Sequence, residues 1–388
     1  MEVVIFNLQK YFLLFLFYKT GSLITDKKSA SATSYFSHLI LPICIYAFFE
    51  GTRWMRGVDY KYNYDIANCK VTSGDIAYDG LAQILHYMGF PYWVFFILIS
   101  ALLITSLMYL CKNYKSAFFP CMTILYAFTM NQSENLMRQY TAISCLLLSF
   151  ALYYNNNYKW AVLWFVIGYF CHSSLLFFIP FFLISICLYK YLSNSDLFSY
   201  IPFLFLLLYL CSNIIENYYL YFLQNISSAE LMIASKYATE TYLSRATDNT
   251  MAETIINNSI LDTIRSHWRS VTIIISGYYI FPKAPTKDHV KFLFTSYCIG
   301  CMGYIYNASL PTLTMEVIAR LGLYLDIFAW FFEGFVIYYF LIKKSHNNTI
   351  NSSFKLMRWV VIVLVLMEAV WILKPREAGV LGLNFIWS

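Results

Sequence analysis

The chain has 388 residues, of which 60% are hydrophobic, 20% aromatic and only 12% charged. A soluble domain carries about 25% charged residues, and the mean hydropathy of +0.56 also excludes a soluble protein. The net charge of +6 does not indicate nucleic acid as a partner, because the lysines lie in short loops between apolar segments. The composition predicts an all-α, polytopic integral membrane protein that is surrounded by membrane lipid.

Apolar segments of membrane-spanning length follow one another along the chain. They predict a helical bundle of about 11–12 transmembrane helices in a single integral membrane domain, residues 1–388. The candidate spans are 3–18, 36–54, 91–111, 116–132, 136–154, 160–171, 173–189, 198–215, 261–281, 290–310, 320–342 and 356–374. Residues 3–18 should be a retained helix, because Glu2 replaces the basic start of a cleavable signal. Residues 160–189 fit one kinked helix, two spans, or half-helices broken at His172.

Lysine and arginine are segregated. Thirteen of the eighteen lysines lie in alternate loops, which the positive-inside rule assigns to the cytoplasm, so both chain ends should face outward. Of the nine arginines, only Arg358 falls on the lysine side. A guanidinium stays charged when it is desolvated and binds phosphate through two parallel hydrogen bonds. The outward bias of arginine therefore predicts an outward-facing site for an anionic group.

Two outer loops are long, residues 55–90 and 216–260. The first is rich in Tyr and Asp, and the second in Asn, Thr, Ser and Tyr. These residue types suit sugar binding through ring stacking and hydrogen bonds to hydroxyls, and they equally suit an interfacial loop with an aromatic belt. We expect the two loops to form a periplasmic, substrate-facing cap.

Two polar groups follow apolar segments in the first half of the chain. Arg53, Arg56 and Asp59 lie at the outer end of the second span, where they could form a shaped binding turn or an ordinary interfacial ion pair. Arg138 and Gln139 lie between two apolar runs. A continuous helix there would pair Arg138 with Glu134, four residues earlier.

His172 interrupts a further apolar run. A lone histidine in such a run is more often a hydrogen-bonded structural residue. Near an arginine cluster it becomes a candidate general base, because its pKa lies near neutrality.

Arg265 and Arg269 begin the ninth span, four residues apart and on one helix face. Like charges at this spacing repel, and Asp262 can offset only part of the repulsion. A bound anion would be a favourable partner. His267 points to roughly the opposite face and is a weaker candidate for the same site.

Arg320 and Tyr324 lie one turn apart at the start of the eleventh span, with Glu316 as a local partner for Arg320. Three acids also fall within spans: Asp326, Glu333 and Glu368. They fit a proton or ion pathway, or more simply pairs with arginines and tyrosines of the bundle.

The sequence contains no Walker A, HExxH, GxSxG or Asp-x-Asp motif, which disfavours an ATPase, a zinc protease, an α/β-hydrolase and a cytosolic metal-dependent sugar-nucleotide transferase. Cys298 and Cys301 have CxxC spacing but lie in an apolar run, where small packing residues are the better interpretation. No cofactor and no metal are expected.

Four patches follow one another along the chain: Arg53…Arg56-Gly57-x-Asp59-Tyr60…Tyr64, Met137-Arg138-Gln139, His172-Ser173 and Arg320…Tyr324. In order and spacing they resemble the EpsG family of bacterial polysaccharide polymerases, which is related to the Wzy-type O-antigen polymerases. The resemblance extends over most of the chain. It implies a GT-C-like membrane glycosyltransferase of the bacterial inner membrane, with its active site facing the periplasm.

The resemblance also implies the substrates. The donor would be a glycan on undecaprenyl pyrophosphate, and the acceptor a hydroxyl of a second lipid-linked repeat unit; a chain-length regulator protein is a candidate partner. Pyrophosphate is a stable leaving anion that needs positive charge more than a general acid. The assigned roles are as follows: Arg138, Arg265, Arg269 and Arg320 bind pyrophosphate, His172 or Asp59 acts as base, Arg53, Arg56 and Gln139 orient the donor, and Tyr324 contacts substrate.

Three other classes stay open. An O-antigen ligase shares the chemistry and differs only in its acceptor. A flippase for lipid-linked sugars would need cationic residues spread through a cavity open to both sides, which the outward arginine bias disfavours. A membrane acyltransferase would need a histidine on the acyl-donor side.

Overall fold

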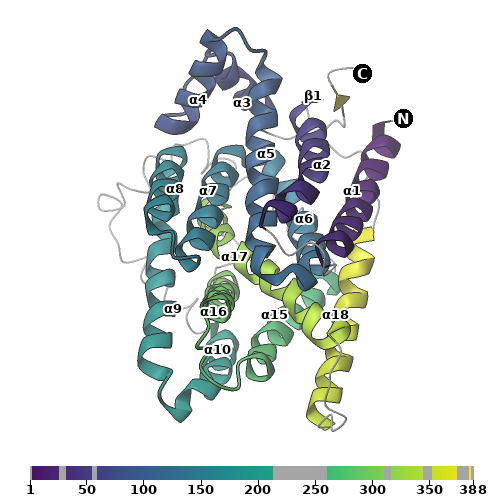
Figure 1. Ribbon diagram of the computed structural model, residues 1–388, viewed down its shortest axis with the longest axis vertical. Coiled ribbons are helices and arrows are strands. Elements are labelled where there is room, and N and C mark those ends of the chain that lie inside the picture. Colours follow the sequence, from purple (N-terminus) through teal and green to yellow (C-terminus); the bar gives the residue numbers. More distant parts are fainter. Residues whose placement is uncertain are drawn as a thin grey trace.

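A helix forms at every position where the apolar pattern predicts a span (Figure 1). The computed structural model describes residues 2–25, 32–54, 59–212, 260–309, 316–343, 352–373 and 384–385. The helices at the predicted spans are α1 (Glu2–Thr25), α2 (Ala32–Gly51), α5 (Tyr92–Leu110), α6 (Phe118–Asn135), α7 (Met137–Tyr154), α8 (Tyr158–Cys171), α9 (Phe178–Leu192), α10 (Ile201–Leu210), α15 (Ile260–Ile280), α16 (Asp288–Ala308), α17 (Glu316–Ile337) and α18 (Ser352–Leu373).

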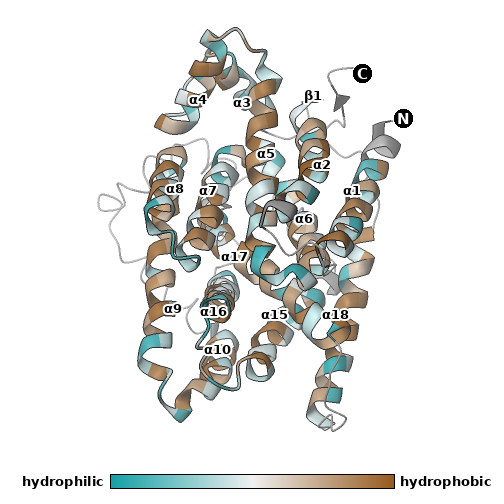
Figure 2. Ribbon diagram, in the orientation of Figure 1, coloured by the Kyte–Doolittle hydropathy of each residue, from teal (hydrophilic) through white to brown (hydrophobic). Residues whose placement is uncertain are grey.

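Length and composition mark many of these helices as membrane-spanning. Within the described residues, four stretches are long and apolar enough to cross a bilayer, and three shorter helices are also apolar. The four stretches are Tyr92–Met130, Ser173–Leu192, Arg320–Ile342 and Ser352–Leu373. Hydrophobic residues predominate along the helices of the bundle (Figure 2). The prediction of an all-α polytopic membrane protein is therefore confirmed.

The start of α1 and the strand β2 (Asn384–Phe385) lie at the same end of the bundle (Figure 1). There, β1 (Arg53–Trp54) pairs antiparallel with β2. The same end carries α3 (Tyr60–Ala67) and α4 (Ile76–Tyr87), which we call the cap. The cap accounts for much of the first long loop. The second, residues 216–260, lies outside the described residues except for the first residue of α15.

The chain reverses direction at His172. An added Cβ on Gly168 would lie 2.8 Å from Leu175 Cδ1 and 2.9 Å from Cys145 Cβ. Leu175 could not approach Gly168 so closely if α8 continued as one helix, because residues seven apart are about 10 Å apart along the axis. Since the rings of Phe178 and Phe150 are in contact, α9 descends beside α7. Residues 160–189 therefore form two helices joined by a turn.

Helix α17 packs at the centre of the bundle. Gly334 lies against the backbone of Cys121 in α6, and Gly300 of α16 lies against Ala329, so both neighbours approach α17 closely because no side chain separates them. Phe128 of α6 stacks on Trp330 at 5.2 Å between ring centroids. This packing fixes the position of α17 along the bundle axis, and with it the positions of the polar residues on α17.

Candidate functional site

The break between α6 and α7 binds the first arginine. Leu136 has φ −105° and ψ 46°, so the last carbonyls of α6 have no intrahelical donor. One of them, the carbonyl of Glu134, accepts a hydrogen bond from Arg53 Nη2 at 3.2 Å. Arg53 Nη1 lies 3.6 Å from the Glu50 carboxylate, and the guanidinium lies 5.6 Å from the Phe96 ring centroid. Arg53 is buried and joins the end of α2 to the break.

Arg138 turns to the cap. Its Nη1 lies 2.8 Å from Asp75 Oδ2, just before α4, and its guanidinium lies 5.4 Å from the Tyr62 ring centroid. The pair with Glu134 that a continuous helix would allow does not form, because the helix is interrupted at Leu136. Burial raises the pKa of Asp75, and the charge of Arg138 and its hydrogen bond act against that rise.

His172 occupies the turn between α8 and α9, with an extended backbone. Burial, and then the charges of Arg138 and Arg320, lower the pKa of His172 to about 4. Within the described part of the chain, its Nδ1 is buried and has no hydrogen-bond partner. The ring is therefore neutral at pH 7.

Helix α17 joins this region through two contacts. The Arg320 carbonyl accepts a hydrogen bond from Gln139 Nε2 at 2.5 Å. The hydroxyls of Tyr324 and Ser174 lie 2.9 Å apart, which connects α17 to the 3-10 helix η2 (Ser173–Phe177) after His172. The breaks at Leu136 and His172 and the start of α17 therefore meet below the cap.

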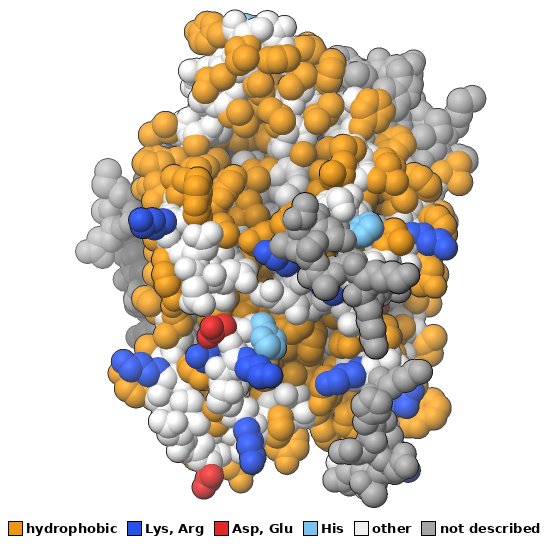
Figure 3. All heavy atoms as spheres, viewed as in Figure 1, with side chains coloured by type: hydrophobic (Ala, Val, Ile, Leu, Met, Phe, Trp, Pro, Cys, Tyr) orange, Lys and Arg blue, Asp and Glu red, His pale blue; other side chains and the backbone are white. Residues whose placement is uncertain are grey.

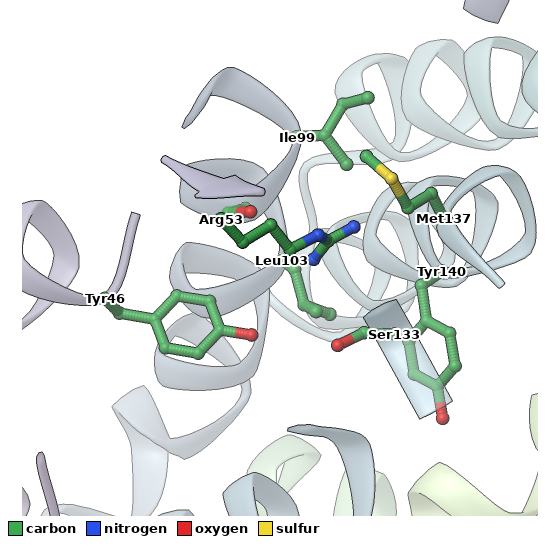
Figure 4. A pocket seen from close by; sticks show the side chains of 8 residues that line it. Tyr46, Arg53, Ile99, Leu103, Ser133, Met137 and Tyr140 are labelled. Atoms are coloured by element: carbon green, nitrogen blue, oxygen red, sulfur yellow. The ribbon is translucent and has the colours of Figure 1, made fainter. Parts of the chain in front are cut away.

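A small pocket adjoins the break (Figure 4). The Arg53 side chain extends into it from one side, and the Tyr46 hydroxyl points toward Ser133 (Figure 4). Met137 and Tyr140 of α7 also line the pocket. The space in the pocket that a water-sized sphere can enter is about 10 Å³, which is roughly enough for one water molecule. It suits water or a small group rather than a whole sugar chain.

The other two predicted arginines belong to a second group. Arg265 Nη1 lies 3.4 Å from Glu368 Oε2, and Arg269 Nη1 lies 4.0 Å from Glu368 Oε1. Glu333 is fully buried and within electrostatic reach of Arg269. The acid of α18 thus occupies the place where we expected an anion, and the simpler interpretation of Glu368 as a partner of bundle arginines is confirmed.

The remaining candidates have the following places. Asp59 precedes α3, where its carbonyl accepts a hydrogen bond from Asn63. Arg56 lies outside the described residues. His267 Nδ1 lies 2.7 Å from the hydroxyl of Tyr209 in α10.

Sequence reasoning missed Asp75 as the partner of Arg138. The acid was visible in the outer loop, but the two residues are 63 positions apart. No local spacing rule assigns such a pair.

The four patches that suggested a family converge in space. Arg53 and Met137 line one pocket, Tyr62 faces Arg138, and Gln139 and Ser174 contact the Arg320–Tyr324 segment. Comparisons with curated proteins and with solved structures gave no match. The model of the EpsG family matches residues 34–378, which extend from α2 beyond α18 and contain all four patches. The chain therefore belongs to the EpsG family.

Proposed function

We propose that this protein is a polysaccharide polymerase that joins undecaprenyl-pyrophosphate-linked repeat units at the periplasmic face of the bacterial inner membrane. Membership of the EpsG family supports a membrane protein of the polysaccharide polymerase type. The observation that carries the site is the meeting of Arg138, His172 and the Arg320–Tyr324 segment below the cap. A GT-C-like architecture and an inverting, metal-independent transfer are parts of the proposal.

The proposed donor site uses Arg138 and Arg320. Arg138 is in the first turn of α7, where the helix dipole also favours negative charge. The Arg138 side chain is 32% exposed. A phosphate oxygen can therefore replace Asp75 as its partner without a rearrangement that uncovers the guanidinium. The charge of Arg320, like that of Arg138, lowers the pKa of His172. Two guanidinium groups would stabilise the charge that develops on the leaving pyrophosphate.

The proposed acceptor site is His172. The acceptor hydroxyl attacks the anomeric carbon from the face opposite the pyrophosphate. The new carbon–oxygen bond forms as the bond to the phosphate oxygen breaks, and that oxygen keeps the electron pair. His172 accepts the hydroxyl proton through a ring nitrogen. Asp59 stays the alternative base.

We propose a positioning role for Arg53 and Gln139, because both bind backbone carbonyls at the break and at α17. Arg265 and Arg269 have Glu368 as their partner, so the direct contacts to pyrophosphate are proposed for Arg138 and Arg320 alone.

The test is polymerisation of radiolabelled lipid-linked repeat units by membranes that contain equal amounts of wild type, Arg138→Ala or Arg358→Ala. Arg358 is an exposed arginine near the start of α18 and serves as the matched control. We expect long polymer from wild type and Arg358→Ala, single repeat units from Arg138→Ala, and no loss in EDTA. Transfer to lipid A core would identify a ligase, and translocation without bond formation a flippase; either result would replace the proposal.

A further inference from the structure

Helix α4 of the cap presents apolar side chains that no described part of the chain covers. Ile76 is 72% exposed, Ile84 59% and Tyr87 84%. At 100° per residue these three fall within about 80° of one another around the helix axis. Met88 and Phe90, which follow the helix, are exposed as well. One face of α4 is therefore largely apolar, and no residue that the structure describes covers it.

The opposite face of α4 packs on the protein. Tyr78 and Ala82 are buried, and the Tyr78 ring meets Phe95 of α5 at 5.0 Å between centroids. Asp79, the one acid of the helix, is also buried, and its Oδ2 accepts hydrogen bonds from the backbone N–H groups of Ser73 and Gly74, each at 2.9 Å. The free face thus carries no Asp, Glu, Lys or Arg, and its polar residue is the exposed Gln83 beside Ile76. Such a face has few side chains that can form hydrogen bonds with water.

The position of α4 along the bundle is suited to contact with the hydrocarbon chains of lipids. After Gly89, whose φ is +79°, the chain enters α5, the start of a strongly apolar membrane-spanning stretch. Because α4 packs against the first turns of α5, it lies at the depth where the apolar part of a span begins. Tyr92 and Trp93 at that level are residues typical of a membrane interface.

The apolar surface continues beyond α4. Helix α4 contacts α8, whose Val166 and Phe170 are also exposed. Figure 3 shows hydrophobic side chains over the upper part of this face, whereas Lys and Arg side chains appear in its middle and lower parts. By contrast, Lys61 of α3 is 74% exposed, so the two cap helices present different surfaces.

We infer that α4 lies in the outer-leaflet interface of the membrane, with Ile76, Ile84 and Tyr87 in contact with lipid hydrocarbon. An amphipathic helix whose polar side is satisfied by protein can bury its apolar side in this way. The membrane then holds the cap, and with it Asp75 beside Arg138, close to the level of lipid phosphates. This inference stands on the surface of α4 and does not depend on the proposed reaction.

The test is a nitroxide label at one position at a time, in vesicles of phosphatidylethanolamine and phosphatidylglycerol. The labelled variants are Ile84→Cys, Lys70→Cys and Val166→Cys, all made after the exposed Cys44, Cys69 and Cys187 are changed to alanine. Lys70 is exposed in the cap and is the water reference, and Val166 of α8 is the lipid reference. Power saturation compares collisions with oxygen, which concentrates in lipid, and with a water-soluble nickel chelate.

We expect the label at Ile84 to favour oxygen over the nickel chelate, as at Val166, and the label at Lys70 to show the reverse. A label at Ile84 that behaves like the one at Lys70 would place this face in water and overturn the inference. Low accessibility to both reagents would also overturn it, because another part of the protein or a second copy would then cover the face.

Discussion

Two groups of arginines in this bundle differ in how their charge is balanced. Arg138 faces one carboxylate, Asp75, and 32% of its side chain is exposed. Arg265 and Arg269 share Glu368, and their side chains are only 15% and 13% exposed. Glu333 and Asp326 are further acids within electrostatic reach of Arg269. The same residue type therefore serves an accessible site in one place and a compensated, buried network in the other.

The comparison shows which arginines can bind an anionic ligand in place of their present carboxylate partner. At Arg138 a phosphate would replace one partly exposed carboxylate, next to a neutral histidine. At Arg269 it would compete with Glu333 and Glu368, which are buried, and stranding a buried acid is costly. The predictions below run from the largest expected effect to the smallest.

Replacing Arg269 should break the buried network. Arg269→Leu leaves Glu333 and Glu368 with less compensating charge, and breaking a buried ion pair costs about 3–5 kcal/mol. We expect a large fall in the melting temperature, measured by thermal challenge and size-exclusion chromatography of the detergent-solubilised protein. Adding Glu368→Gln to Arg269→Leu should recover part of the loss. An unchanged melting temperature in the single variant would show that the network is not structural.

Replacing Arg138 should remove catalysis and leave the fold intact. We expect Arg138→Ala to polymerise about 10²–10³ times more slowly, as when one stabilising donor is lost from a transition state. Its melting temperature should stay near that of the wild type, in contrast to Arg269→Leu. Arg138→Lys should fall between, because an ammonium keeps the charge but not the planar fork. A normal rate in Arg138→Ala would remove this arginine from the site.

Replacing His172 tests the proposed base. His172→Ala should slow polymerisation about 10²-fold, near the lower end of the range for general bases, because a base of lowered pKa takes up the proton less readily. The readout is the initial rate at saturating lipid-linked donor. A rate equal to that of the wild type would make His172 a structural residue and leave Asp59 as the candidate.

The pH dependence of the polymerisation rate is a second test of His172 as the base. Because the pKa of His172 is lowered to about 4, the ring is neutral above that pH and is lost as a base only below it. The kcat/KM profile should therefore show no acid limb from His172 between about pH 5 and 8. A bound pyrophosphate would offset the two arginines, so the kcat profile should show a higher pKa. Identical profiles would place the anion away from His172.

Removing the acid beside Arg138 should have the smallest effect. Asp75→Asn leaves Arg138 without its carboxylate, and a partly exposed ion pair is worth about 0.2–1 kcal/mol. We expect the KM for donor to fall by up to about fivefold, since the donor no longer displaces a charged competitor. The matched variant Asp65→Asn removes a cap acid that pairs with lysines instead. A raised KM in Asp75→Asn alone would mean that Asp75 orients Arg138.

Hydropathy predicted the helices well, because in lipid every backbone N–H and C=O must be bonded within a helix. It could not predict α3 and α4, since the loop before α5 has no long apolar run. Local spacing predicted that His267 points away from Arg265 and Arg269, and in the structure His267 contacts Tyr209 of α10. The same kind of reasoning allowed a Glu134–Arg138 pair, and there it failed, because it assumed a continuous helix through Leu136.

The sequence by itself determined the membrane class, the positions of the spans and the polar interruptions of the apolar runs at Arg138 and His172, because these depend on composition and on neighbours along the chain. Tertiary structure decided which charges meet. Asp75 reaches Arg138 across 63 positions, and Glu368 reaches Arg265 across 103. Electrostatic partners depend on distance in space, which the packing of α17 and the cap sets and no local pattern records.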